Sequence, residues 1–250
     1  MCRHLAYVGP SVTLEELILV PEHSLLRQAS APRYQTHGRF NADGFGVGWY
    51  DRDTRVEPAR YRTTRPIWAD TSFASVAGLV RSDAVLAAVR SASPGMPVEE
   101  TSTAPFTDGA WLFSHNGFVP GFEGETGRGL RRTVSDTRVQ KIAGGSDSEL
   151  LFALVLDRLD AGAPPADALV SVVALVEERQ PDARLNFLLT DGEQIAATAC
   201  RNSLFVLDDR ERTGAVVVAS EPYDDGAGWE AVADRSVVEL DEDKLVVRPF

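Results

Sequence analysis

The sequence has little cysteine and no long apolar run. It contains two cysteines in 250 residues, too few for a disulfide scaffold or a cysteine-rich zinc site. The apolar runs Leu150–Leu156 and Leu169–Val176 are far shorter than the about 20 residues that span a bilayer. The N-terminus lacks a basic region followed by an apolar segment, so we expect neither a signal peptide nor a contact with membranes.

Basic charge is also scarce. Lysine and arginine total 25 against 37 acidic residues, which gives a net charge of −12. Binding to DNA or RNA depends on basic side chains that neutralise phosphates, so this balance argues against a nucleic-acid partner. With 44% hydrophobic and 25% charged residues, the composition is typical of a soluble globular protein. Free thiols indicate a cytoplasmic protein, and the sequence leaves any protein partner open.

Short β-like runs dominate both ends of the chain, and the clearest helical patterns lie between them. Because the α/β alternation of a doubly wound sheet is missing, this order favours an α+β fold, with helices on antiparallel sheets, in one domain over residues 1–250. Helices are predicted over Thr13–Val20, Thr71–Leu79, Asp147–Leu159 and Pro165–Glu178. Strands are predicted over Leu5–Val8, Phe45–Tyr50, Ala84–Arg90, Trp111–His115, Leu185–Thr190, Gln194–Cys200, Leu204–Leu207, Ala215–Ala219 and Leu245–Val247.

Local signals refine these elements. Ser146, with Glu149 three residues later, predicts a reciprocal capping box at a helix start. Pro165 suits the first turn of the next helix. The Asp191–Gly192 pair predicts a two-residue hairpin turn. The polar, glycine-rich stretch Pro120–Gly145 predicts a long loop, and loops of that length tend to be functional or mobile.

Cys2 is the first candidate for chemistry. If Met1 is removed, the chain begins with a residue that carries both a thiol and an α-amine. The pKa of such an amine is about 7.7–8.0 in peptides, so the amine can serve as the base for its own nucleophile. Cysteine also occurs at this position by chance, so Cys2 alone does not establish catalysis.

Three further motifs are each ambiguous in isolation. Asn116 and Gly117 end an apolar strand, where an amide and a backbone N–H can form an oxyanion hole or simply a turn. Arg90 follows a buried strand, where it can bind a carboxylate with help from Ser93 or reach solvent. Asp147 begins a helix, where it can accept a ligand ammonium or only complement the helix dipole.

Other residues favour structural interpretations. Cys200 lies in a strand of small residues and is predicted to be a buried thiol. His4, His37 and His115 lack the spacing of a metal site, and His115 is interpreted as structural. The glycines of the segment Asn41–Gly48 indicate a close backbone approach near a site, or a brace for the N-terminal strand. The segment Ser220–Pro222 follows a strand and is expected to close over the pocket.

Taken together, these motifs resemble the class-II glutamine amidotransferases, which are N-terminal-nucleophile hydrolases. The resemblance covers Cys2, the segment Asn41–Gly48, Arg90, Asn116–Gly117 and Asp147. It implies a four-layer αββα sandwich in which the N-terminal cysteine attacks a γ-glutamyl carboxamide. It also implies that the Asn-Gly pair forms the oxyanion hole, the arginine binds the α-carboxylate and the aspartate binds the α-ammonium.

The sequence also resembles, in more detail, the ergothioneine-pathway branch of that family. This resemblance rests on Met1–Leu5, Tyr34–Gly48, Ala87–Ala92, Gly95–Pro97 and Ala104–Phe106. It implies hydrolysis of γ-glutamyl-hercynylcysteine S-oxide to glutamate and hercynylcysteine S-oxide, with no metal or organic cofactor. That substrate carries a trimethylammonium group, which an aromatic wall can bind. The candidates for this wall are Phe45, Trp49, Trp111, Phe118 and Phe122.

Two alternatives remain open from the sequence. One is a glutaminase subunit that passes ammonia to a partner synthase, although no synthase domain follows. The other is a non-catalytic binding protein on the same fold. The presence of Cys2, Arg90, Asn116, Gly117 and Asp147 together favours an enzyme over the latter.

Overall fold

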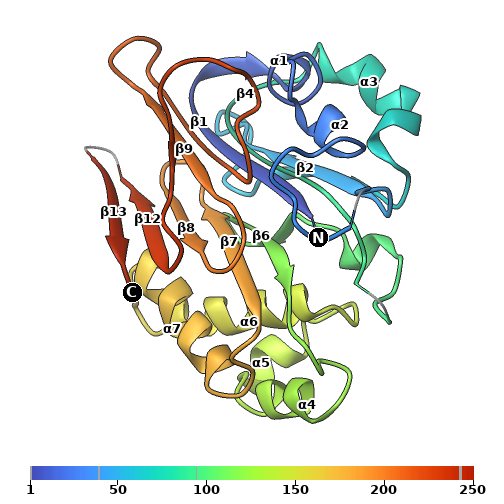
Figure 1. Ribbon diagram of the computed structural model, residues 1–250, viewed down its shortest axis with the longest axis vertical. Helices are drawn as coiled ribbons and strands as arrows, with labels where there is room; N and C mark the ends of the chain where they lie inside the picture. The colour runs from blue at the N-terminus through green and yellow to red at the C-terminus, as the bar shows by residue number, and fades with distance from the viewer. Residues whose placement is uncertain (1, 39, 94, 242–243) are drawn as a thin grey trace.

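In the computed structural model, residues 2–38, 40–93, 95–241 and 244–250 are described. Met1, whose removal the sequence leads us to expect, lies outside them. Two antiparallel sheets lie between two groups of helices (Figure 1). The layers therefore run helix, sheet, sheet, helix, which confirms the expected four-layer sandwich.

The first sheet has seven strands among the described residues. In spatial order they are β11 (Trp229–Ala231), β9 (Phe205–Asp209), β10 (Ala215–Ala219), β1 (Arg3–Thr13), β4 (Arg81–Val89), β2 (Phe45–Trp49) and β3 (Ala59–Thr63). The second sheet has six within the same ranges: β13 (Leu245–Pro249), β12 (Ser236–Leu240), β8 (Ile195–Ala199), β7 (Arg184–Thr190), β6 (Trp111–Phe118) and β5 (Phe106–Asp108). The strands β3, β5, β11 and β12 were not predicted.

The helices fall into two groups. The helices α1 (Leu14–Ile18), α2 (Leu25–Gln28) and α3 (Thr71–Ala77) cover the first sheet. The helices α4 (Glu125–Arg131), α5 (Asp136–Val139), α6 (Asp147–Asp160) and α7 (Pro165–Glu177) lie on the side of the second sheet (Figure 1). Short 3-10 turns occur at Ile67–Ala69 and Glu100–Ser102.

Side-chain alternation along the strands explains the layers. On β1, Leu5 and Tyr7 pack against the first helical group, whereas Ala6 between them belongs to the core between the sheets. On β6, Leu112 faces the other sheet, and Phe113 stacks on Phe152 of α6 with ring centroids 5.1 Å apart. Successive strand residues point to opposite faces, so each sheet buries both of its faces.

The start of α6 confirms half of the predicted capping box. The Ser146 hydroxyl accepts a hydrogen bond from the Glu149 backbone N–H at 3.3 Å. The reciprocal half is wrong, because the Glu149 carboxylate accepts instead from the backbone N–H groups of Ala143 and Gly144. That carboxylate therefore holds the preceding loop against the helix start. Pro165 does occupy the first turn of α7, as predicted.

The predictions for two connecting segments are wrong. Pro120–Gly145 contains α4 and α5 rather than one long loop. Gly127 of α4 is buried, and an added Cβ there would lie 1.9 Å from the Phe122 backbone oxygen, so the glycine permits close packing. The turn at Asp191 spans four residues, because Thr190 pairs with Ile195. The Asp191 carboxylate accepts backbone N–H groups inside this turn, which stabilises the longer form.

Candidate active site

The site forms where strand ends from the two sheets meet. Arg3 of β1 pairs with Val89 of β4, which places Cys2 beside Arg90. In the other sheet, β6 ends at Phe118. Cys2 is partly buried, and its Sγ lies 3.9 Å from the Ser91 backbone oxygen. The topology thus brings residues that are distant in the sequence to one edge of the sandwich.

Cys2 lines a small cavity together with most of the predicted site residues. This cavity, called the Cys2 cavity below, has a volume of about 20 Å³. It is lined by Cys2, Arg90, Ser91, Ala92, Ser93, Met96, Ser102, His115, Gly117, Ser146, Asp147 and Ser148. A second cavity of about 20 Å³ adjoins it and also includes Cys2, Arg90 and His115.

Arg90 supplies the positive charge of the Cys2 cavity. One terminal nitrogen of its guanidinium, Nη2, donates to the Pro97 backbone oxygen at 2.7 Å. The other, Nη1, is buried and has no hydrogen-bond partner among the described residues. The Arg90 backbone pairs with Asp43 and Gly44, so the glycine-containing segment expected near the site braces this arginine. A buried cation with an unused donor suits a ligand carboxylate.

Asp147 supplies the negative charge on the α6 side. Its Oδ2 accepts from the Val119 backbone N–H at 3.1 Å, and its Oδ1 accepts from the Ser148 backbone N–H at 2.7 Å. The Ser148 hydroxyl also lies 3.2 Å from Oδ1, whereas Oδ2 keeps a second lone pair, so the group can also accept a ligand ammonium. The Cys2 cavity therefore presents opposite charges at fixed positions.

His115 connects three elements around the cavity. Its Nε2 lies 2.9 Å from the Arg184 backbone oxygen, and its Nδ1 lies 3.0 Å from the Ser148 hydroxyl. Because a carbonyl oxygen can only accept, Nε2 carries a proton, and in the neutral ring Nδ1 is an acceptor. The Ser148 hydroxyl has one hydrogen and two acceptors within reach, His115 Nδ1 at 3.0 Å and Asp147 Oδ1 at 3.2 Å. These bonds support the structural interpretation of His115 and hold β6, β7 and α6 together. The sequence did not single out Ser148.

Gly117 lies where no side chain fits. An added Cβ would lie 1.8 Å from the Arg184 backbone oxygen and 2.1 Å from the His115 Nε2. The glycine therefore allows the end of β6 to approach both β7 and the cavity, which leaves its backbone exposed to a ligand.

Asn116 is buried behind the cavity. Its Nδ2 donates to the Ser220 hydroxyl at 3.3 Å, and within the described chain its Oδ1 has no partner. The same hydroxyl accepts from the His4 backbone N–H at 3.0 Å. The Asn116 side chain is thus held against β1, close to the residue that follows Cys2 by two positions. An amide nitrogen carries two hydrogens, so one remains for a substrate oxygen.

A buried ion pair stands behind Cys2. Arg3 Nη1 lies 3.6 Å from Glu221 Oε1, and both side chains are 0% exposed. Burial lowers the pKa of Arg3, and the charge of Glu221 opposes that shift. Arg3 also donates to the Cys2 backbone oxygen at 2.8 Å. The expectation that Ser220–Pro222 closes over the pocket is therefore wrong, because Ser220 and Glu221 are buried beneath it.

The aromatic wall expected around the ligand is mostly part of the hydrophobic cores. Phe45 is 1% exposed and packs against Phe73, with centroids 5.0 Å apart, so its predicted ligand contact is wrong. Trp49, Trp111 and Phe122 pack against core clusters. Phe118 alone among the five candidates, all of which are described, lines a cavity beside the site.

A wider cavity adjoins the Cys2 cavity on its outer side. It measures about 250 Å³ and is called the outer cavity below. It is lined by His37, Gly38, Ser91, Ala92, Ser93, Phe118 and Arg184, so the residues Ser91 to Ser93 border both cavities. Sequence reasoning missed Arg184, because its position follows from the pairing of β7 with β6.

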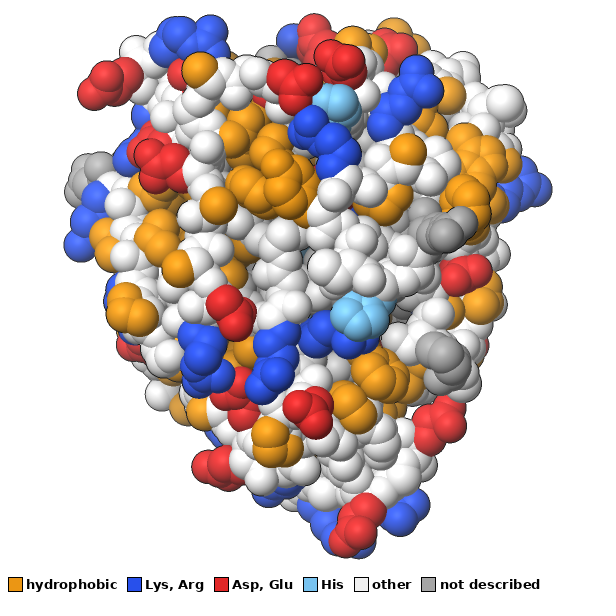
Figure 2. Space-filling model, viewed as in Figure 1, with side chains coloured by type: hydrophobic (Ala, Val, Ile, Leu, Met, Phe, Trp, Pro, Cys, Tyr) orange, Lys and Arg blue, Asp and Glu red, His pale blue; other side chains and the backbone are white. Residues whose placement is uncertain are grey.

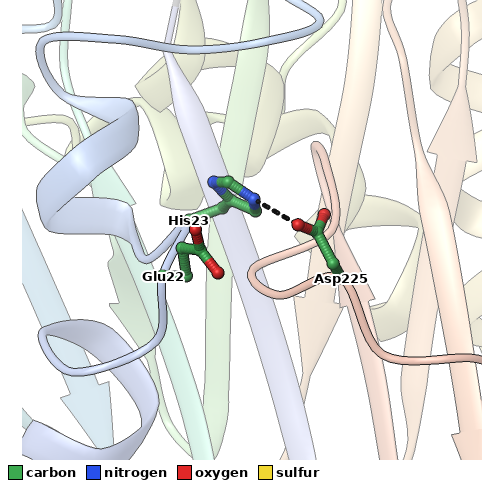
Figure 3. Close-up of side chains that lie close together, drawn as sticks. All are labelled: Glu22, His23 and Asp225. Carbon is green, nitrogen blue, oxygen red and sulfur yellow. Dashed lines mark hydrogen bonds and ion pairs between the residues drawn. The ribbon is translucent and has the colours of Figure 1, made fainter.

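Two other features lie away from this site. Glu22, His23 and Asp225 form a surface cluster whose ligand atoms lie within 4.8 Å of one another (Figure 3). Arg33 Nη1 lies 2.8 Å from Asp225, and this cation opposes metal binding there.

Cys200 is buried as predicted, and burial raises the pKa of its thiol to about 12. Across the described ranges, no helix has the length and apolar character needed to cross a membrane.

Comparisons with known proteins agree with this geometry. The sequence profile of the class-II glutamine amidotransferases matches residues 28–212. The γ-glutamyl-hercynylcysteine sulfoxide hydrolase of Mycolicibacterium smegmatis is 42% identical over 254 residues, covering 100% of both chains. The Mycobacterium tuberculosis enzyme of the same name is 42% identical over 240 residues, covering 96% of this chain and 93% of that one.

A solved structure shows a similar fold over the whole chain. The glutamine aminotransferase class-II domain protein from Silicibacter pomeroyi superposes with a TM-score of 0.74 at 26% identity, covering 100% of this chain and 99% of that one. The profile match and the full-length identity to the mycobacterial enzymes show that this chain belongs to the class-II glutamine amidotransferase family.

Proposed function

We propose that this protein hydrolyses the γ-glutamyl amide bond of γ-glutamyl-hercynylcysteine S-oxide and releases glutamate and hercynylcysteine S-oxide. The observation that carries the proposal is that Cys2 shares one cavity with Arg90 and Asp147. The relatives that are 42% identical bear the name of this activity. The free thiols of Cys2 and Cys200 favour a reducing, cytoplasmic setting.

The glutamyl end of the substrate is a zwitterion. Arg90 binds its α-carboxylate through the guanidinium, including the unused Nη1, and Ser93 adds a hydroxyl. Asp147 binds the α-ammonium, and the two charges set the orientation of the glutamyl group. Holding both ends places the γ-carbonyl carbon at the Cys2 sulfur, which removes much of the entropic cost of the reaction.

Cys2 then acts as nucleophile and base in one residue. The thiol loses its proton to its own α-amine, directly or through one water, because the thiolate is the reactive form. The sulfur attacks the γ-carbonyl carbon, and the second Nδ2 hydrogen of Asn116 with the Gly117 N–H stabilises the oxyanion. The protonated α-amine gives its proton to the leaving nitrogen, and the C–N bond breaks to form a γ-glutamyl thioester.

Water completes the cycle. It attacks the thioester carbonyl, with the Cys2 amine accepting its proton, and glutamate leaves as the thiol is restored. The oxyanion hole serves both steps, since each passes through a tetrahedral oxyanion. This sequence of steps calls for no metal or organic cofactor.

The test follows products by mass spectrometry. Purified wild type and Cys2→Ala are incubated with γ-glutamyl-hercynylcysteine S-oxide, and separately with glutamine. We expect wild type to release glutamate and hercynylcysteine S-oxide, to act more slowly on glutamine, and to lose both activities in Cys2→Ala. Equal release by Cys2→Ala would refute the mechanism. Faster turnover of glutamine would refute the substrate and favour a glutaminase that supplies ammonia to a partner.

A further inference from the structure

The outer cavity has a charge that the steps above do not use. It is lined by Arg184 and His37 together with small residues and Phe118, and none of its described lining residues is acidic. Figure 2 shows basic side chains gathered beside a histidine across the lower middle of the viewed face. A cavity with cationic and hydroxyl groups, and without a carboxylate of its own, suits an anionic ligand group.

Arg184 is held in place but has no counter-ion among the described residues. It pairs with Phe118 across β6 and β7, and its guanidinium carbon lies 5.7 Å from the centre of the Phe118 ring. Its Nε is buried without a hydrogen-bond partner in the described chain, and no described carboxylate forms an ion pair with it. Partial burial lowers the pKa of Arg184. An anion would satisfy the Nε and offset this desolvation.

The outer cavity borders the Cys2 cavity through three shared residues. Ser91, Ala92 and Ser93 line both this cavity and the Cys2 cavity. The Cys2 sulfur lies 3.9 Å from the Ser91 backbone oxygen, on the same stretch of chain. With the glutamyl end held by Arg90 and Asp147, the amide nitrogen and its substituent extend toward this shared border.

The leaving group carries two carboxylates, one on its cysteine part and one on its hercynyl part, and the one nearer to the bond that breaks is the candidate for Arg184. The amine released from γ-glutamyl-hercynylcysteine S-oxide is an amino acid, with a carboxylate on the carbon that bears the leaving nitrogen. Ammonia, released from glutamine, has no such group. A guanidinium binds a carboxylate through two parallel hydrogen bonds, which adds direction as well as energy.

We propose that Arg184, stacked on Phe118, binds the carboxylate of the leaving amino acid, so that the outer cavity selects amino-acid leaving groups over ammonia. This inference rests on the proposed function and names a specificity residue for it. It also changes the expected role of Phe118. The guanidinium already covers this ring, so the ring supports Arg184 rather than a trimethylammonium group.

The test compares leaving groups with and without that carboxylate. The paired substrates are γ-glutamyl-S-methylcysteine S-oxide and its analogue in which a hydrogen replaces the cysteine carboxylate. Arg184→Gln should lower kcat/KM for the first by about 10- to 100-fold, the scale of hydrogen bonds to a charged group. It should change the second by less than about twofold. Arg184→Lys should lie between, because it keeps the charge but loses the planar fork.

Inhibition gives a readout that does not depend on turnover. Glutamate binds only the Cys2 cavity, so its inhibition constant should be the same in wild type and Arg184→Gln. The inhibition constant of S-methylcysteine S-oxide should rise by about the same 10- to 100-fold. The control is Arg212→Gln, which removes an equal charge from a side chain that is 78% exposed on the β9–β10 turn. It should leave both constants unchanged.

The outcomes separate the two proposals. If Arg184→Gln weakened glutamate as much as S-methylcysteine S-oxide, or lowered kcat/KM equally for both paired substrates, the role of Arg184 would be refuted. Unchanged values for every ligand would refute it as well. If wild type cleaved the paired substrates but not γ-glutamyl-hercynylcysteine S-oxide, the proposed function would fail while the Arg184 comparison still stood.

Discussion

The Cys2 cavity and the outer cavity are neighbours that are built differently. The first holds about 20 Å³ between an arginine and an aspartate that are both bonded to the backbone. The second holds about 250 Å³, and the one arginine among its described lining residues, Arg184, rests on an aromatic ring. A narrow cavity with two fixed charges recognises one chemical group. A wide cavity in which the described residues offer a guanidinium and no carboxylate can accept variable groups that share a carboxylate.

The difference has a structural cause. The Cys2 cavity lies where β1 and α6 begin and β4 and β6 end, so its residues are held by both sheets. The outer cavity is bordered by His37 and Gly38, which belong to the connection between α2 and β2. Loop segments tolerate change more easily than strand ends. Specificity for the leaving group can therefore change without disturbing the nucleophile.

Adding a side chain at Gly117, where β6 approaches β7, should have the largest effect. In Gly117→Ala, the new Cβ would meet the Arg184 backbone oxygen at 1.8 Å and the His115 Nε2 at 2.1 Å. Both cavities depend on these neighbours, so turnover should fall by about 1000-fold, as expected when oxyanion donors are displaced. Steady-state kinetics on both paired substrates, with and without the carboxylate, should show the same loss.

Gly129→Ala is the matched control for this prediction. Gly129 lies in α4, where an added Cβ would meet only Arg179 side-chain atoms, at 3.8 Å or more. Alanine favours helices by up to about 1 kcal/mol over glycine, so activity should persist and stability should rise slightly. Full activity in Gly117→Ala would show that β6 and β7 have more room than these distances indicate.

Removing the ion pair behind Cys2 should lower the stability of the whole fold, and with it that of both cavities. Glu221 faces Arg3, and its Oε2 also accepts from the Arg33 and Tyr34 backbone N–H groups, at 2.6 Å and 3.2 Å. Glu221→Gln leaves the buried Arg3 charge uncompensated, which typically costs about 3–5 kcal/mol. The free energy of unfolding from urea titrations measures the loss.

The double variant Arg3→Met with Glu221→Gln tests the cause of that loss. It removes the stranded charge, so it should recover part of the stability. If the single and double variants were equally unstable, the packing of the segment Arg33–Tyr34 would explain the loss instead of the charge.

Weakening only the binding of the glutamyl α-ammonium should lower activity without changing the preference for leaving groups. Asp147→Asn removes the charge that pairs with the α-ammonium and places an amide against backbone donors. We expect kcat/KM to fall by about 100-fold, the scale for losing one member of a charge pair, for both paired substrates alike. Asp136→Asn is the control, since Asp136 begins α5 in the same way but is exposed. A different loss for the two substrates would mean that the cavities do not act independently.

The elements that could be predicted carry a local signature. Ser146 and Pro165 mark helix starts because their chemistry acts within one turn, and both occupy those positions. Residues around α4 could not be interpreted in this way. Glycine at position 127 lowers the local helix propensity. It is needed because the helix packs closely against the backbone of the preceding loop, a contact that exists only in the folded chain. Tertiary packing here overrides a local preference.

The site shows the same division. Cys2, Arg90, Ser93, Gly117 and Asp147 line one cavity, whereas Asn116, which the sequence groups with them, is buried behind it. Their catalytic and binding roles stay predictions. Arg184 has no local signature, since it begins a strand as many arginines do. Its role follows from pairing with Phe118 across two strands separated by more than 60 residues. The prediction for Glu221 is wrong for a related reason, since sequence patterns do not reveal whether a connection covers the surface or, as here, is buried.

The smallest expected effect is a pH dependence of the free energy of unfolding. Because it concerns the whole fold, it should affect both cavities alike. His4 is fully buried, its Nδ1 lies 3.0 Å from the Ser114 hydroxyl, and burial beside Arg3 lowers its pKa well below 6.5. The unfolded chain therefore binds a proton below about pH 6.5 that the folded chain does not, and the free energy of unfolding falls as pH falls. One such proton changes stability by at most about 1.4 kcal/mol per pH unit. His4→Asn should flatten this slope between about pH 6.5 and pH 5 in urea titrations. An unchanged slope would assign the acid sensitivity of stability to another group. A pH dependence of kcat/KM that appeared for only one of the paired substrates would place that other group in one of the cavities.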